Sequence, residues 1–252
     1  MCFSVLLKLI WGENMGIGDI ISKSVSYPFS DLTKFLMVGI GVILYDLDAI
    51  LAEVFGYDSF IVLIALIIAI LFSFVMAGYS VNLTKKGIDN SNEIPNFDYA
   101  NNFIDGLKLF VVYLVYFIIP TIITLVLLFL FGAIGAGFYQ TVGSLGIWVV
   151  FAVIIFILFG IFELVAQARF AISHSISDAL NIGEVFADVK RIGILKIILF
   201  SIVVWILLFV YAALLGIVTV VPVIGTVLTD IILGAFIFLF FNYGIGLLYS
   251  DI

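Results

Sequence analysis

Six long apolar segments constrain the fold of this chain more than any other feature of its sequence. They lie at about 35–54, 59–78, 108–131, 147–168, 195–218 and 224–248. Each provides the ~20 mostly apolar residues with which an α-helix crosses the hydrocarbon core of a bilayer. The chain is 65% hydrophobic and 11% charged, whereas soluble domains average ~45–50% apolar and ~25% charged residues. The sequence therefore predicts an all-α, polytopic membrane protein with six transmembrane helices.

The positive charges predict how these helices are oriented. All Lys and Arg residues precede the first apolar segment or lie around the connections that follow the second and the fourth. They are Lys8, Lys23, Lys34, Lys85, Lys86, Lys108, Arg169, Lys190, Arg191 and Lys196. Basic residues of multispanning proteins collect on the cytoplasmic side. We therefore expect a multi-pass protein of the cell membrane with cytoplasmic N- and C-termini, and with residues 79–107 and 169–194 on the same side.

The apolar segments divide the chain into two unequal parts. Residues 1–34 are expected to form an N-terminal cytoplasmic or interfacial segment, in which Pro28 ends a helix near the membrane. Residues 35–252 are expected to form a single membrane domain. Within it, residues 59–131 and 147–218 each contain a helix toward the cytoplasm, an amphipathic connection and a helix away from it. Because both units have the same orientation, they predict a parallel two-fold repeat about the membrane normal.

Both cytoplasmic connections are expected to contain amphipathic helices along the inner membrane interface. In the second, Asn181 is placed to cap a helix, and Glu184 occupies the position of a capping box. Helical spacing gives this helix an apolar face with Ile182, Val185, Phe186, Val189 and Ile192, and a polar face with Asp188, Lys190 and Arg191. In the first connection, Pro95 predicts a non-helical break at 90–96, after which Asp98 caps a helix that leads into the third segment.

Three short motifs carry a resemblance to a known family. They are Gly78-Tyr79, Ile94-Pro95-Asn96-Phe97-Asp98 and Asp105-Gly106-Leu107-Lys108. The chain from Met15 onward is similar to the archaeal integral membrane proteins grouped as domain of unknown function 4013, although Tyr99 stands where that family typically has Trp. The second half more distantly resembles the membrane domain attached to glycerophosphodiester phosphodiesterases, which is not itself the hydrolase. The resemblance implies a membrane fold and supplies no activity.

Ionisable side chains at membrane depth are candidates for function, because they are costly in hydrocarbon. Asp46 and Asp48 lie late in the first segment and allow two interpretations. In one, they form a proton or cation site near mid-bilayer. In the other, the first helix is short and its end turns amphipathic, so that Asp46, Asp48 and Glu53 face the outer water. Three acidic residues within eight consecutive positions favour the second interpretation, in which this segment faces water.

A second polar group is expected near the inner ends of the fourth and sixth segments. Glu163 and Gln167 are spaced one helical turn apart, and Asn242 should lie at a similar depth. We expect Glu163 to face the bundle interior and to pair with Asn242, Gln167 or Arg169. Asp230, near the start of the sixth segment, is expected at the outer boundary.

The sequence also excludes several kinds of site. Cys2 is the only cysteine and His174 the only histidine, which excludes a thiolate cluster and a multi-histidine metal site. No cofactor-binding motif is present, and no basic face of the size that nucleic acid requires.

Three further segments carry local expectations. His174 is expected in a solvated turn. The glycines of 132–146 are expected to form a dipping loop or a close helix contact, and both Met1 and Met15 can serve as the start of the chain.

Two functions remain compatible with this pattern. The first is a non-enzymatic protein whose cytoplasmic amphipathic helices organise lipid or protein partners, a second copy of the chain included. Lys85, Lys86, Lys190 and Arg191 are then candidate contacts for anionic headgroups. The alternative is a transporter or channel for a small solute or ion through the helix bundle. A hydrated cavity joining Asp46 or Asp48 to Glu163 would favour the alternative, and a closed apolar bundle would favour the first.

Overall fold

The computed structural model describes residues 15–252 except 135–140, 219–220, 222 and 251. These residues form helices and short connections, without a strand among them. Five helices are long and apolar enough to cross a membrane, and a sixth span is reached if one bent helix pair is included. The prediction of an all-α membrane protein is therefore confirmed. Cys2 and the tip of the glycine-rich segment 132–146 lie outside the described residues.

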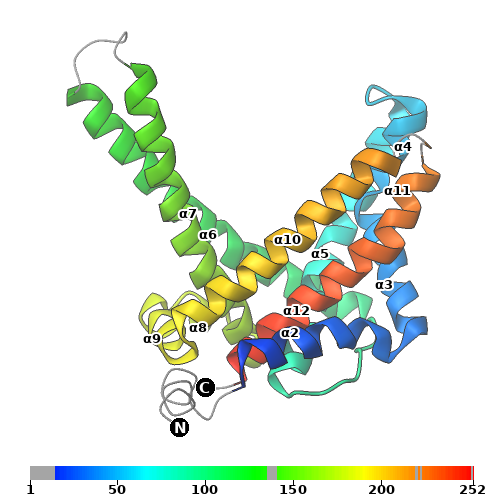
Figure 1. The fold of residues 1–252 in the computed structure, drawn as a ribbon. Helices are drawn as coiled ribbons and strands as arrows, with labels where there is room; N and C mark the ends of the chain where they lie inside the picture. Colours follow the sequence, from blue (N-terminus) through cyan, green and yellow to red (C-terminus); the bar gives the residue numbers. More distant parts are fainter. Residues whose placement is uncertain (1–14, 135–140, 219–220, 222, 251) are drawn as a thin grey trace.

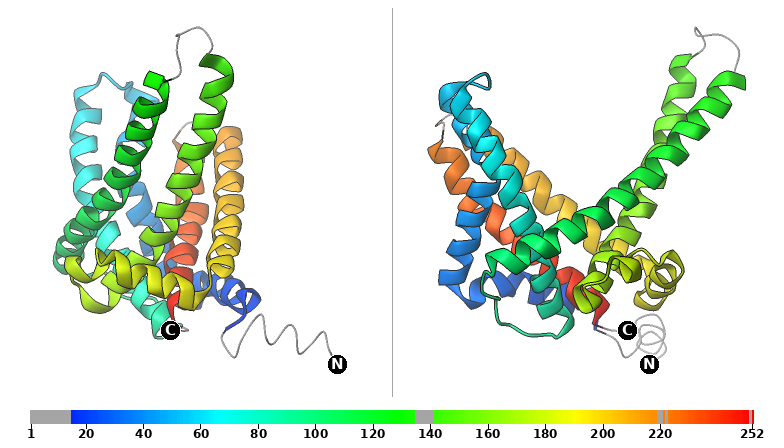
Figure 2. Two further views of the ribbon diagram at one scale, coloured as in Figure 1. Left: turned by 90° about the vertical axis from the view of Figure 1, so that its left-hand side faces the viewer. Right: turned by 180° about the vertical axis from the view of Figure 1, so that it is seen from behind.

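The helices form two arms that meet at one end of the molecule (Figure 1). In chain order they are α2 (Ile17–Ser26), η1 (Tyr27–Ser30), α3 (Leu32–Tyr45), α4 (Leu47–Phe55), α5 (Phe60–Ile88), α6 (Tyr99–Ile134), α7 (Thr141–Ser173), α8 (Ile176–Ala179), α9 (Ile182–Ile192), α10 (Ile194–Val218), α11 (Ile224–Thr229), η2 (Asp230–Gly234) and α12 (Ala235–Tyr249). The far halves of α6 and α7 form one arm, and α3, α4, α5, α11 and α12 form the other (Figure 2). The described Lys and Arg residues all belong to elements or helix ends where the arms meet, here called the basic end.

The two-fold repeat and the domain boundary at residue 34 stay predictions.

The first span is shorter than its apolar sequence. α3 ends at Tyr45, and Asp46 (φ −100°, ψ 17°) leaves the helical conformation before α4 begins. At the basic end, the chain turns by 92° between the α2–η1 pair and α3. The single helix predicted over 35–54 is therefore wrong. The first helix is short, as in the second interpretation, but Asp46 is partly buried and does not lie on an open outer surface.

The second and third spans are longer than predicted. α5 extends to Ile88, and α6 begins at Tyr99. The expected amphipathic connection is thus mostly a continuation of two helices, and only residues 89–98 are non-helical. The Asp98 carboxylate accepts a hydrogen bond from the backbone N–H of Asn101 at 3.3 Å. The predicted break and its cap are both present.

The non-helical connection 89–98 is held by side chains of neighbouring elements. Hydroxyl and ammonium groups donate to its carbonyls in three pairs, Tyr27 to Glu93 (3.0 Å), Lys34 to Ile94 (2.6 Å) and Tyr79 to Pro95 (2.9 Å). The ring of Tyr79 also stacks on Phe97, with 4.0 Å between centroids. Lys86 Nζ donates to the Glu93 carboxylate at 2.7 Å, and this hydrogen bond holds the pKa of Glu93 below its ordinary value. Two motif residues, Tyr79 and Phe97, thus fasten the connection to α5.

α9 begins as the sequence predicts but buries an unexpected residue. Asn181 Oδ1 accepts a hydrogen bond from the N–H of Glu184 at 3.3 Å, which confirms the cap. Asp188, predicted on the polar face, is only 1% exposed. Its carboxylate binds Arg169 Nη1 at 2.5 Å and accepts a hydrogen bond from the Tyr249 hydroxyl at 2.7 Å. Because these partners lie on other helices, the periodicity of α9 alone does not predict the burial of this carboxylate.

α5 contacts two neighbouring helices backbone to backbone. Gly78 of α5 and Gly106 of α6 lie so close to the opposite helix that a Cβ atom at either position would overlap a backbone carbonyl. Gly87 of α5 and Gly246 of α12 form a second contact of this kind. Small residues promote helix association in lipid, because close approach increases van der Waals contact. The glycines therefore position α6 and α12 on α5.

Replacement of Gly78 by alanine should destabilise the protein. The added methyl group would overlap the carbonyl of Asn102, and overpacking of this kind costs about 1–3 kcal/mol. Gly160→Ala in α7 is the matched control, because a Cβ atom there meets nothing within 4 Å. Thermal unfolding in detergent should show a lower midpoint for Gly78→Ala only. Equal midpoints for the two variants would contradict the close contact.

Candidate functional site

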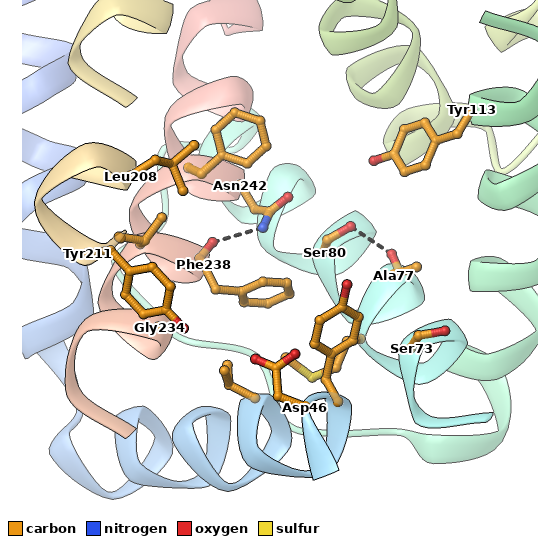
Figure 3. Close-up of a pocket in the computed structure, with 15 residues that line it drawn as sticks. Asp46, Ser73, Ala77, Ser80, Tyr113, Leu208, Tyr211, Gly234, Phe238 and Asn242 are labelled. Carbon is orange, nitrogen blue, oxygen red and sulfur yellow. Dashed lines mark hydrogen bonds between the residues drawn. The ribbon is translucent and has the colours of Figure 1, made fainter. Parts of the chain in front are cut away.

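A cavity of about 450 Å³ is lined mainly by residues of α3, α5, α10 and α12 (Figure 3). Its walls come from α3, α5, α6, α10, η2 and α12, and most of its lining is apolar. The polar side chains that line it are Tyr45, Asp46, Ser73, Ser80, Tyr113, Tyr211 and Asn242. Apolar cavities of ~300–1,000 Å³ with a few polar groups are typical small-molecule sites.

Asp46 is the only charged side chain among the described residues that line this cavity. It occupies the break between α3 and α4, where its backbone N–H donates to the carbonyl of Val42 at 3.0 Å. Its carboxylate does not cap α4, and it has no hydrogen-bond or ion-pair partner in the described part of the chain. Figure 3 shows it directed into the cavity. The helix break therefore presents a carboxylate that the fold does not use.

Aromatic rings form much of the remaining wall. They belong to Tyr45, Tyr113, Tyr211, Phe238 and Phe241. The face of an aromatic ring carries negative electrostatic potential and attracts cations within ~6 Å. Asp46 and Tyr113 lie at opposite ends of the cavity in Figure 3. A ligand between them would contact a carboxylate at one end and aromatic surface along its length.

A network of buried hydrogen bonds holds one side of the cavity. Gln167 Nε2 donates to Asn242 Oδ1 at 2.8 Å and to Thr84 Oγ1 at 2.9 Å. Tyr113 donates its hydroxyl proton to Gln167 Oε1 at 2.8 Å. Asn242 Nδ2 donates to the Phe238 carbonyl at 2.8 Å. The network joins α5, α6, α7 and α12, and it fixes the two lining side chains of Tyr113 and Asn242.

A second carboxyl group lies behind the cavity wall. Asp230 begins the π-helical segment η2 and is 1% exposed. Its Oδ1 accepts a hydrogen bond from the lining Tyr211 hydroxyl at 2.7 Å. Its Oδ2 is buried without a partner among the described residues. Asp230, expected at the outer boundary, is thus enclosed by protein. It begins a π-helical segment, and such segments are frequent at functional sites.

The first segment contributes one of its two candidate residues to the cavity. Asp46 lines it, whereas Asp48, in the first turn of α4, does not. Tyr113 and Tyr211 are site residues that the sequence does not single out. The chain contains 11 Tyr and 26 Phe, and nothing in their spacing distinguishes those that line the cavity from those that face lipid.

The predicted pairing of Glu163 is not found. The Glu163 carboxyl group makes no hydrogen bond or ion pair within the described part of the chain. Each of its expected partners is engaged elsewhere, since Gln167 binds Asn242 and Arg169 binds Asp188. Gln167 lies one turn closer to the basic end and reaches α12 in place of Glu163.

The described residues do not provide a metal site. No group of three or more His, Cys, Asp or Glu side chains within them is arranged to hold a metal ion. His174 ends α7 with φ 51°, and its Nδ1 lies 2.9 Å from Asp105 Oδ2. This contact joins α7 to α6 and lies outside the cavity lining.

Replacement of Gln167 by leucine should destabilise the bundle. Asn242 Oδ1 and the Tyr113 hydroxyl would each lose a buried partner, and such losses cost about 1–3 kcal/mol. Tyr113→Phe removes only one bond of the network and should have a smaller effect. Thermal unfolding in detergent compares the two variants. A wild-type midpoint for Gln167→Leu would show that the network does not stabilise the bundle.

Comparison with known proteins supports the resemblance carried by the motifs. Residues 60–221 match the family described as Protein of unknown function (DUF4013). No curated protein and no solved structure matches the chain. The matched region covers more than half of the 252 residues and contains α5, α6, α7, α8, α9 and α10. The chain is therefore a membrane protein that belongs to the DUF4013 family.

Proposed function

We propose that the protein binds a small organic cation in the cavity and carries it across the membrane. The observation that carries this proposal is the unpartnered carboxylate of Asp46 in a cavity with aromatic walls. Among the described residues the cavity joins Asp46 to Asn242 and Tyr113 and does not reach Glu163, so the expected connection is found only in part. A cavity of this size still agrees better with a transporter than with a closed apolar bundle.

The charges around the cavity favour a cationic ligand. Asp46 lines the cavity, and Asp230 lies behind Tyr211. The described Lys and Arg residues lie at the basic end. Carboxyl groups without a nearby cation create a negative potential, which is strong where the dielectric constant is low. A positively charged ligand would reduce this electrostatic cost, and an anion would increase it.

The walls favour a ligand with an apolar body. Phe238, Phe241 and three tyrosines surround the space, and their rings gain both apolar burial and cation–π attraction from such a ligand. Molecules of this class partition into lipid, so the bilayer itself can supply them to a cavity among membrane-spanning helices.

We further propose that the basic end faces the cytoplasm, as the positive-inside rule indicates. α3 has 14 residues and rises ~1.5 Å per residue, which places Asp46 about 21 Å from its start. In a hydrocarbon core of ~30 Å, Asp46 would then lie in the outer half. A cation would meet this carboxylate from the outside first.

Binding of tetraphenylphosphonium to the purified protein in detergent tests the charge requirement. Tetraphenylborate has the same shape and the opposite charge, so it should bind at least about tenfold more weakly. Asp46→Asn should weaken tetraphenylphosphonium binding by a similar factor in equilibrium dialysis. Asp48→Asn, the matched control outside the cavity lining, should leave the affinity unchanged. Equal affinities of Asp46→Asn and wild type would remove the basis of the proposal.

Uptake of ethidium into vesicles that contain DNA tests transport separately. The wild-type protein should raise the rate of the fluorescence increase above that of protein-free vesicles. Asp46→Asn should return the rate to that baseline, because the cation would lose its binding site. Binding without uptake would overturn the transport role and leave a cation-binding membrane protein.

A further inference from the structure

We propose that a groove between α7 and α9 binds one anionic phospholipid, with its phosphate at Lys190 and an acyl chain along α7. The groove has a volume of about 500 Å³. It lies at the basic end, separate from the cavity that contains Asp46, and shares no lining residue with it. The proposal is therefore independent of cation transport.

The groove resembles a lipid site because its walls are apolar and one charged side chain lies at its edge. Phe162 and Leu158 of α7 face Phe186 of α9 and Ile194 of α10, and Lys190 is the only charged residue among the described lining residues. Phe186 and Ile194 are 47% and 50% exposed. The described part of the chain leaves these side chains about half uncovered, so at the end of a membrane-spanning helix a lipid chain is the apolar surface available to them.

Lys190 differs from the other three candidate headgroup contacts. Those three form ion pairs, Lys85 with Asp89 (2.6 Å), Lys86 with Glu93 (2.7 Å) and Arg191 with the buried Asp188 (3.3 Å). Lys190 makes no ion pair in the described part of the chain. It is exposed, and its Nζ lies 4.2 Å from the centroid of the Phe186 ring. The groove thus ends at a positive charge that no carboxylate among the described residues neutralises.

The placement of this ammonium group suits a phosphate. A lysine ammonium has three donors, and contact with a ring face does not consume them as hydrogen bonds to an acceptor would. The ring also positions Nζ at the edge of the apolar groove. A phospholipid places its phosphate and its acyl chain at this same boundary between water and hydrocarbon.

Mass spectrometry of the intact protein, released from micelles with equal amounts of phosphatidylglycerol and phosphatidylcholine, tests the proposal. The wild type should retain one phosphatidylglycerol about fivefold more often, the effect of one basic residue near a membrane surface. Lys190→Gln should abolish this preference, and Lys190→Arg should keep it. Lys85→Gln is the matched control, because Asp89 already neutralises Lys85, and this variant should also keep the preference.

Inorganic phosphate should not displace the lipid, since it has no chain to fill the groove. An unchanged preference in Lys190→Gln would overturn the proposal and leave the groove to a protein partner. An equal loss in Lys85→Gln would also overturn it, because any surface charge would then have the same effect. Displacement by phosphate alone would show an anion site without a lipid. The substituted side chains are exposed or half-exposed, so far-ultraviolet circular dichroism should be unchanged in all variants.

Discussion

The close contact of α5 with its two neighbours determines the arrangement of the remaining helices. Gly78 and Gly106 bring α6 against one side of α5, and Gly87 and Gly246 bring α12 against another. Lipid provides no hydrophobic drive for helices to associate, so van der Waals contact has to replace it. Because α6 and α12 are both anchored to α5, the cavity walls that these three helices provide have fixed positions. The glycines of the family motifs thus serve the fold, and the cavity is a consequence of how they place the helices.

The polar groups inside the bundle are of two kinds. Gln167, Asn242 and Thr84 satisfy one another, so they stabilise the helix packing and leave little capacity for a ligand. Asp46 has no such partner in the described chain, although an unpaired carboxylate at membrane depth is costly. Tyr113 belongs to both groups, since it binds Gln167 and lines the cavity. The assignment of a function to Asp46 rests on this contrast between satisfied amides and an unsatisfied acid.

Local properties of the sequence predicted the helix caps and the membrane-spanning character of the chain, whereas long-range contacts determined much of what it did not predict. Hydropathy over ~20 residues is sufficient for a membrane helix, and the cap at Asn181 depends on residues within one turn. Asp188 is buried because Arg169 and Tyr249 reach it from two other helices, and no periodicity within α9 encodes those partners. The helix break at Asp46 lies in a continuous apolar pattern, so the sequence left its role open. The tyrosines that line the cavity could not be predicted either, because the contacts that place them there come from other helices.

α12 is synthesised after every other described helix, yet it packs near the middle of the assembly. It reaches η1 through the stacked rings of Tyr27 and Tyr243, whose centroids lie 3.8 Å apart. It also meets α5 at Gly87 and completes the hydrogen bonds of Gln167 through Asn242. Until α12 inserts, Gly87 of α5 lacks its close contact, and the amide of Gln167 has Thr84 Oγ1 but not Asn242 Oδ1 as an acceptor. Insertion of the last described helix is therefore the step that completes both the backbone contact at Gly87 and the amide network of Gln167.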